Sequence, residues 1–225
     1  IVPPPVSPAL EHIRTLALVG PAAAGKTTLA EALLQHTGAM GAAGSVERGS
    51  TVSDHDALEI KAGHSLQSSV MHLDHGGCRI HLIDTPGAPD FIGQSLPALE
   101  AVETAAIVIN AAAGIEPMAR RMMAYAAEQQ LDRLVIVNKI DAEGADLPGL
   151  LADCGRKGVK GAVILASGFR ETGSEGAKLE QQVLDAARAG GVRIIGPNTS
   201  GMFNLHKNVN LLDLRNVKAG DIGFI

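Results

Sequence analysis

Aromatic residues are nearly missing from this chain of 225 residues: they make up 2% of it, and there is no tryptophan. A packed core must therefore come from Ala, Val, Ile and Leu, and the hydrophobic content of 46% is enough to build one. The two cysteines are too few for a disulfide framework, which favours a reduced, cytoplasmic location. No apolar run approaches the roughly 20 residues of a membrane span, so we expect no membrane partner.

An excess of positive charge is also lacking, because the formal net charge is −5 at pH 7. This argues against a broad basic surface that would bind nucleic acid regardless of its sequence. The first residues, IVPPPVSPALEH, show neither the basic nor the apolar region of a signal peptide. Since they include no initiator methionine, we expect a processed or excised fragment with a proline-rich, extended lead-in.

The most informative stretch is LALVGPAAAGKTTLAEALLQ, residues 16–35. It places the pattern GxxxxGKT between an apolar β-rich run and a helical pattern, which is the context of a phosphate-binding loop. Glycines let the backbone curl so that N–H groups point at an anion, and the helix N-terminus faces the same phosphates. Lys26 would reach the β- and γ-phosphates, and the Thr27 hydroxyl would ligate Mg²⁺. The predicted nucleotide-binding residues of this loop are Gly20, Ala23, Ala24, Gly25, Lys26, Thr27 and Thr28.

Apolar runs and helical patterns alternate along the rest of the chain. Runs such as AIVINA and LVIVNK have no period-two alternation, which is typical of parallel strands covered by helices on both faces. We therefore predict an α/β fold, a three-layer sandwich with a mostly parallel sheet, in which a P-loop NTPase-like part is continued by a Rossmann- or flavodoxin-like βαβ unit on the same sheet. The expected strands are 13–19, 67–74, 79–84, 105–110, 133–138, 160–166, 192–196 and 221–225, and the expected helices are 26–36, 92–104, 116–130 and 175–189.

The motif DTPG, residues 84–87, ends the second strand of a predicted hairpin. Ligands of open parallel sheets bind beyond the carboxyl ends of the strands, so Asp84 would lie beside the phosphate loop. There it would hold Mg²⁺ through a water, and the Gly87 N–H would bond the γ-phosphate. Alone, the motif is an ordinary turn; after GxxxxGKT, it makes Lys26 and Gly87 the predicted catalytic residues.

The motif NKID, residues 138–141, ends the next strand but one. The Asp141 carboxylate would accept two hydrogen bonds from the guanine ring N–H and amino group, which adenine does not offer at those positions. Asn138 would tie the loops together, and the stem of Lys139 would cover the base. Alone, this motif too is an ordinary turn, but with the other two it predicts a GTP or GDP site.

The segments GPAAAGKTTL, GSVERGSTVSDHDALE, AGHSL, DTPGAPDFIGQ, AVETAAIVINAAAGIEP and VNKIDAEGADLPGLL together resemble the GTPase domain of translation elongation factor G and its close paralogues. The resemblance covers residues 12–153. It implies that residues 37–66 form the first switch, with Ser65 in the place of a Mg²⁺-binding threonine. It also implies that residues 84–90 begin the second switch and that Thr27, Ser65 and Asp84 form the metal site.

Two departures from that family affect the expected activity. The family usually has a histidine after DTPG that orients the attacking water, and this chain has Ala88. Because positioning supplies most of phosphoryl-transfer catalysis, we expect nucleotide binding with hydrolysis slowed by about 10²-fold or more. His64 is a candidate substitute for that role, and the alternative is that it is an ordinary solvated loop histidine. The family's ribosome-contacting domains are not found in the sequence, so ribosome binding is not expected.

Residues 156–225 are expected to follow a different family. The segments KGVKGAVILASGFRETGSEGAKLEQQVLDAARAGGVRIIGPNTSGMFN and KAGDIGFI resemble the CoA-binding domain of ADP-forming acyl-CoA synthetases and of the succinyl-CoA synthetase α subunit. The resemblance implies that Ser167, Gly168, Pro197 and Asn198 help to line a CoA site. The alternative is that these turns only end strands. The glycine-rich CoA loop of that family is not found.

The two resemblances meet near residues 153–158, so we expect a chimera with a GTPase part, 1–154, and a CoA-binding βαβ part, 155–225. In the GTPase family a Ser-Ala turn contacts guanine through a backbone N–H, and the turn at Ser167 would partly replace it. Three hypotheses follow: a weak GTPase, a CoA-binding module or acyl-CoA ligase fragment, and an inactive chimera. Competition between GTP, ATP and CoA for the site separates them.

Overall fold

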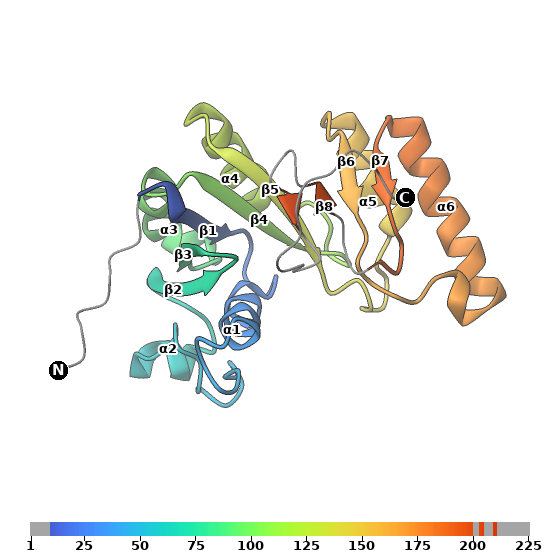
Figure 1. The fold of residues 1–225 in the computed structure, drawn as a ribbon. Helices are drawn as coiled ribbons and strands as arrows, with labels where there is room; N and C mark the ends of the chain where they lie inside the picture. The colour runs from blue at the N-terminus through green and yellow to red at the C-terminus, as the bar shows by residue number, and fades with distance from the viewer. Residues whose placement is uncertain (1–9, 200–202, 205–208, 211–225) are drawn as a thin grey trace. The chain divides into compact units, whose positions relative to one another are not determined.

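The computed structural model describes residues 10–199, 203–204 and 209–210 of the chain, which divides into two compact units, Ile1–Ala145 and Asp146–Ile225 (Figure 1). This division falls earlier than the expected boundary between residues 154 and 155. The expected lead-in at the N-terminus, apart from its last residues, and the expected strand 221–225 lie outside the described residues.

The first unit contains a mixed sheet of five strands in the order β2-β3-β1-β4-β5. The central pairs β1–β3, β1–β4 and β4–β5 are parallel, and only β2 pairs in the antiparallel sense, with β3. This confirms the expected mostly parallel α/β fold. The elements are η1 Leu10–His12, β1 Ile13–Val19, α1 Lys26–His36, α2 Ala57–Ala62, β2 Ser69–His75, β3 Cys78–Asp84, η2 Pro89–Phe91, α3 Ile92–Glu100, β4 Thr104–Asn110, α4 Pro117–Glu128 and β5 Asp132–Asn138.

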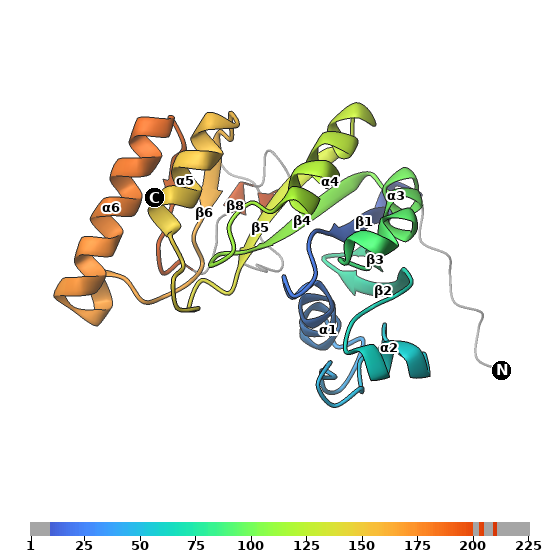
Figure 2. The same ribbon diagram turned by 180° about the vertical axis from the view of Figure 1, so that it is seen from behind.

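Helices cover both faces of this sheet, as the unbroken apolar strands require. One core cluster joins α1 to the sheet through side chains such as Leu34, Leu18 and Val108, all with at most 4% of their surface exposed. On the other face α3 and α4 lie in front of the strands (Figure 2). Successive side chains of a strand point to opposite faces, so β1 and β4 contribute to both layers and carry no polar alternation.

The turns of the first unit follow from short sequence signals. Gly76 and Gly77 both have positive φ and close the hairpin between β2 and β3, as expected. Asp56 caps α2 through the Leu58 N–H, and Glu59 completes a capping box, so that a short helix forms inside the long loop predicted for residues 37–66. The sequence carries this Asp-x-x-Glu signal, but the helix was not among the expected elements.

The second unit has its own small core and its own sheet. Strands β6 and β7 pair in parallel, and Phe169, Val183, Ala187 and Val192 are buried against them and the neighbouring helices. We expected these strands to extend the sheet of the first unit, whereas they form a two-stranded sheet of their own. The elements are α5 Leu147–Arg156, β6 Gly161–Val163, η3 Arg170–Thr172, α6 Ser174–Gly190, β7 Arg193–Ile195, β8 Phe203–Asn204 and β9 Val209–Asn210.

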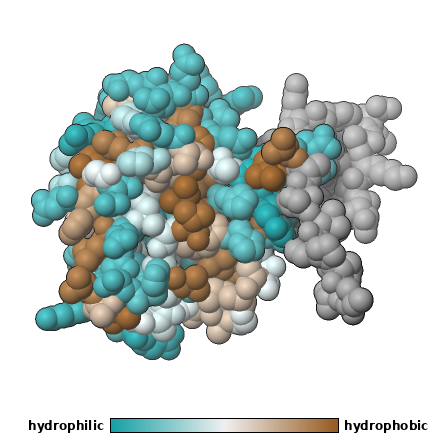
Figure 3. Space-filling view, turned by 90° about the vertical axis from the view of Figure 1, so that its left-hand side faces the viewer, coloured by the Kyte–Doolittle hydropathy of each residue, from teal (hydrophilic) through white to brown (hydrophobic). Residues whose placement is uncertain are grey.

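The surface of the first unit is mixed rather than uniformly polar. Seen from the side of β2 and α2, hydrophobic patches interrupt the hydrophilic face (Figure 3). Val52, Leu58, Ile60 and Val70 are the large apolar side chains that these elements and the preceding loop leave exposed. Within the described ranges, no helix combines the length and the apolar character needed to cross a bilayer.

Candidate guanine-nucleotide site

The loop between β1 and α1 has the backbone of an anion-binding nest. Gly20, Ala23 and Gly25 all have positive φ, which turns successive N–H groups toward one point. A side chain at Gly20 would collide with the carbonyl oxygen of Val108, so this glycine is required by close packing as well as by its φ. Gly25 caps α1 without a side-chain hydrogen bond, so the first N–H groups of the helix can serve a ligand.

Lys26 lies inside the curve of this loop. Its Nζ donates to the carbonyl oxygens of Gly20 at 3.0 Å and Pro21 at 2.8 Å, and the residue is only 6% exposed. Burial lowers the pKa of Lys26 to about 8, although the carboxylates of Asp84 and Asp54 oppose this change. The ammonium is thus held at the centre of the loop, where a phosphate would restore the favourable environment that burial removes. Thr28, two residues later, is exposed.

Two hydroxyls and two carboxylates meet at the start of α1. Thr27 Oγ1 donates to Asp84 Oδ2 at 2.6 Å and lies 3.3 Å from Ser65 Oγ, which in turn donates to Asp54 Oδ1 at 2.6 Å. The second oxygens, Asp84 Oδ1 and Asp54 Oδ2, are buried and have no hydrogen-bond partner among the described residues. The structure thus brings together all three residues of the predicted metal site and adds Asp54.

This cluster fits a magnesium ion that also contacts a nucleotide. Mg²⁺ prefers oxygen ligands and is usually held by one or two protein groups together with waters and phosphate oxygens. The described residues contain no group of three or more His, Cys, Asp or Glu that would suit a metal on its own. The hydroxyls of Thr27 and Ser65 would be direct ligands, and the unpartnered Asp84 oxygen would accept a hydrogen bond from a metal-bound water.

Burial also controls the charge of Asp84. The residue is 1% exposed, and desolvation raises its pKa to about 6, although the Thr27 hydroxyl and the Lys26 ammonium favour the ionised form. Desolvation likewise raises the pKa of Asp54. Burial therefore disfavours the ionised form of both carboxylates. A divalent cation bound beside them would stabilise that form.

The DTPG segment packs directly against the phosphate loop. A side chain at Gly87 would collide with Lys26 Nζ and with the Ala22 N–H, which shows how closely the two segments approach. Thr85 Oγ1 donates to the carbonyl oxygen of Leu18 at 2.8 Å and fixes the segment to β1. Gly87 is therefore adjacent to the place that a γ-phosphate would occupy.

Ala88 follows Gly87 and presents only a methyl group to this region. His64 is half-buried, its ring centroid lies 6.1 Å from that of Phe91, and its Nδ1 lies 3.2 Å from the Ser65 carbonyl oxygen. His64 is thus close to the segment after Ala88 and packs against it, while its replacement of the usual histidine remains a prediction.

The NKID motif is tied to the phosphate loop by one side chain. Asn138 Nδ2 donates to the carbonyl oxygen of Ala24 at 3.0 Å, as expected of a residue that joins the loops. Lys139 has a φ of 57°, and the turn that it begins leaves both Lys139 and Asp141 exposed. Asp141 has no hydrogen bond or ion pair within the described part of the chain, so its carboxylate is available to a base.

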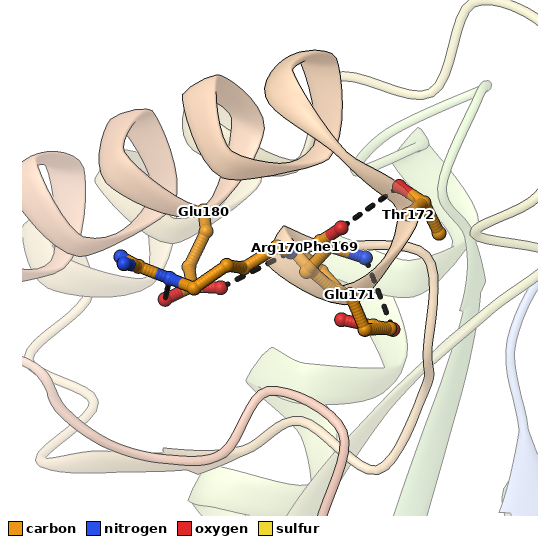
Figure 4. Close-up of polar contacts among 5 residues, drawn as sticks. All are labelled: Phe169, Arg170, Glu171, Thr172 and Glu180. Carbon is orange, nitrogen blue, oxygen red and sulfur yellow. Dashed lines mark hydrogen bonds and ion pairs between the residues drawn. The ribbon is translucent and has the colours of Figure 1, made fainter.

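Ser167 lies in the second unit, in an exposed turn after β6. The Glu171 carboxylate accepts the N–H groups of Gly168 at 2.6 Å and Phe169 at 3.2 Å. Two more hydrogen bonds stabilise this turn (Figure 4): Arg170 Nε donates to Glu180 Oε1 at 3.1 Å, and Thr172 Oγ1 donates to the Phe169 carbonyl oxygen at 2.8 Å. These bonds use the backbone donors that follow Ser167, and the assignment of Ser167 to the nucleotide site stays a prediction.

Two buried glutamates were missed by the sequence reasoning. Glu31 on α1 is 1% exposed and accepts the N–H groups of Gly44 and Val52, both at 2.6 Å. Glu59 on α2 is 3% exposed and accepts those of Leu66 at 2.9 Å and Gln67 at 3.1 Å. The available signal was that Glu31 falls on the apolar side of α1, beside Ala30 and Leu34, where a carboxylate needs partners.

Comparison with known protein families finds a match to the Elongation factor Tu GTP binding domain over residues 11–203. This range includes the phosphate loop, DTPG and NKID. It also runs through residues 153–158, where a junction was expected, and the comparisons give no support to a CoA-binding segment or to a chimera at that point.

Individual relatives agree with this match. Peptide chain release factor 3 of Symbiobacterium thermophilum is 38% identical over 138 residues, which is 59% of this chain and 26% of the relative. The elongation factor G-like protein of Mycobacterium tuberculosis is 36% identical over 129 residues, 57% of this chain and 18% of the relative. A crystal structure of a Thermus thermophilus protein has 31% identity and a TM-score of 0.65, covering 77% of this chain and 31% of that one. The matched part is between 18% and 31% of the length of these three proteins, so this chain spans less than a third of each.

Proposed function

Because this chain belongs to the Elongation factor Tu GTP binding domain family, we propose that it binds GTP and GDP with Mg²⁺ and hydrolyses GTP slowly. The observation that carries the proposal is the convergence of three motifs on one edge of the sheet. Asn138 bonds to the phosphate loop, Asp84 bonds to Thr27, and Gly87 lies against Lys26. Turns after parallel strands share one edge of the sheet in any case, but here close contacts also join the three motifs around one loop.

Each motif has a distinct task in this proposal. The loop N–H groups and the Lys26 ammonium hold the phosphates, and the Gly87 N–H bonds the γ-phosphate. Thr27 and Ser65 would hold Mg²⁺, which would neutralise charge that develops on the phosphates. Asp84 keeps the Thr27 hydroxyl oriented, and its second oxygen would be free to accept a hydrogen bond from a metal-bound water. Asp141 accepts two hydrogen bonds from guanine.

The slow rate follows from Ala88. Its methyl group cannot accept a proton or a hydrogen bond, so the attacking water is positioned less well than a histidine would allow. His64, the half-buried neighbour of Phe91, is the one side chain in that region that we carry as an alternative. Action on the ribosome is not part of the proposal, because the match covers only 26% of the release factor 3 relative and 18% of the elongation factor G-like relative.

CoA binding is also left out of the proposal. It rested on the resemblance of residues 156–225, and the family match covers most of that segment. Ser167 remains a candidate for the nucleotide site through a backbone N–H.

The Asp141→Asn variant tests base recognition. An amide presents one acceptor and one donor to the guanine edge, so one of the two hydrogen bonds is lost and a donor faces a donor. We expect the preference for GTP over ATP to fall by about 10- to 100-fold compared with the unmodified chain. The preference is measured by competition of each nucleotide against a fluorescent GTP analogue. Glu143→Gln, an exposed change in the same loop, is the matched control and should leave the preference intact. An unchanged preference in Asp141→Asn would refute the assignment.

A further inference from the structure

The loop between α1 and α2, residues 37–56, is held by the buried carboxylate of Glu31. Two backbone N–H groups of this loop, those of Gly44 and Val52, donate to Glu31 Oε2 and Oε1 respectively, each at 2.6 Å. Each carboxylate oxygen thus takes one donor. Hydrogen bonds to a charged, buried acceptor are about twice as strong as neutral ones, so this is a strong attachment.

The segment between the two attachment points closes on itself. Ser50 N–H donates to the Ser45 carbonyl oxygen at 3.1 Å, and Ser45 N–H donates to Ser50 Oγ at 3.1 Å. A side chain at Gly44 would collide with the Ser50 carbonyl, so the two ends of the segment lie close together. Glu31 therefore binds the neck of a compact subloop, residues 44–52, and fixes the chain that leaves it.

That chain leads directly to the candidate metal site. Ser53 and Asp54 follow Val52 with exposed fractions of only 1% and 4%, and Thr51, just before Val52, is 7% exposed. Asp54 Oδ1 accepts the Ser65 hydroxyl at 2.6 Å, and Ser65 Oγ lies 3.3 Å from Thr27 Oγ1. None of these hydrogen bonds joins Glu31 to Ser65 or Thr27. Asp54 nevertheless lies only two residues after Val52, which Glu31 holds.

We propose that Glu31 is a positioning residue which clamps the neck at Gly44 and Val52 and so places Asp54 and Ser65 for the metal ion. Its effect on nucleotides rests on the proposed function. Switch segments of GTPases are ordered by contacts to the γ-phosphate and Mg²⁺ and are released on hydrolysis. Because Ser65 lies in the segment expected to be the first switch, the clamp strengthens GTP binding more than GDP binding. The loop N–H groups and Lys26, which hold the shared phosphates, do not depend on it.

The Glu31→Gln variant removes the charge and one acceptor with almost no change in volume. One N–H of the neck then faces an amide donor, and the subloop should open more often. Arg48 is exposed within this subloop and offers trypsin a cleavage site. We expect cleavage after Arg48 to become about 10-fold faster, as loss of a charged hydrogen bond implies, with cleavage after Arg121 of α4 as the internal reference.

Glu128→Gln is the matched control, because Glu128 is an exposed carboxylate at the end of α4, outside the subloop. It should leave cleavage after Arg48 unchanged. In Mg²⁺, Glu31→Gln should raise the Kd for GTP about 10-fold and that for GDP by less than about 2-fold, since only the triphosphate uses the clamped arrangement. Equal weakening of both nucleotides, or equal cleavage of both variants, would overturn the proposal.

Amide hydrogen exchange of the unmodified protein gives a test that needs no variant. The Gly44 and Val52 amides lie outside helices and strands, and Glu31 is their acceptor. They should exchange at least about 10-fold more slowly than the exposed Glu47 amide. Rapid exchange at both would refute the clamp even if Glu31→Gln failed to fold. A protein that bound no nucleotide would refute the proposed function, while exchange and cleavage would still decide the clamp.

Discussion

Asp84 lies in an unfavourable environment for a carboxylate in the candidate site. Its carboxylate is buried, and one of its oxygens has no partner among the described residues. A group in this position costs stability when ionised, and it persists in a fold when it serves a ligand. The pKa of about 6 gives this statement a measurable consequence.

The pH dependence of stability should reveal the buried Asp84 carboxylate. Its pKa is raised from 3.8 to about 6 in the folded protein, so between these values the folded state holds the proton that the unfolded state has lost. This group therefore lowers the free energy of unfolding as the pH rises through that window, and the loss is complete above about pH 7. In metal-free, nucleotide-free protein, Asp84→Asn should be stabilised relative to the unmodified chain by about 2 kcal/mol more at pH 7.5 than at pH 4.5.

Urea unfolding at a series of pH values measures this difference. Asp90→Asn, at an exposed position six residues later, should shift stability by the same small amount at each pH. A difference between Asp84→Asn and the unmodified chain that does not change with pH would show that burial does not raise the pKa of Asp84.

Ala88 gives the second prediction at this scale. The Ala88→His variant adds a ring nitrogen that can accept a hydrogen bond from the attacking water beside Gly87. We expect single-turnover GTP hydrolysis to become about 10²-fold faster, with little change in nucleotide affinity, because the gain belongs to the transition state. Ala88→Leu adds bulk without an acceptor and should give no gain. If both variants leave the rate unchanged, another group positions the water.

At the scale of elements, local signals were sufficient wherever neighbours in sequence are also neighbours in space. The strand 13–19 and the helix 26–36 were predicted with the bounds observed for β1 and α1, and the Gly-Gly hairpin was confirmed. Glycine conformations and helix N-termini depend on a few adjacent residues, which is why the phosphate loop could be read directly. The helix predicted as 92–104 ends at Glu100, because the chain must extend before β4 begins at Thr104.

Contacts between distant segments were harder to predict. The clusters around Asp54, Glu31 and Glu59 arise when a long loop returns to α1, and no periodic pattern encodes that return. The partner of a short strand is equally hidden: β6 and β7 have three residues each, and their own composition does not say which edge they join. The motifs therefore predict the nucleotide contacts, and the structure adds the buried carboxylates that hold the loops around them.

At the scale of the whole molecule, the family match spans both compact units. It covers residues 11–203, whereas the sequence reasoning divided the chain between two families near residue 154. The two turns that were expected to line a CoA site, one at Ser167 and Gly168 and one at Pro197 and Asn198, resembled another α/β family because glycine-containing strand-ending turns recur in unrelated folds. The convergent motifs of the first unit are more specific, since each must occupy a fixed place around one ligand.

Calorimetric titration of the unmodified chain with GTP in the presence of Mg²⁺ tests the central claim most directly, which is that the phosphate loop and NKID together form one guanine-nucleotide site. We predict one site per chain, competition by GDP, no competition by ATP or CoA at equal concentration, and loss of binding in Lys26→Ala. Absence of heat with GTP, or ATP and GTP binding equally well, would contradict the account.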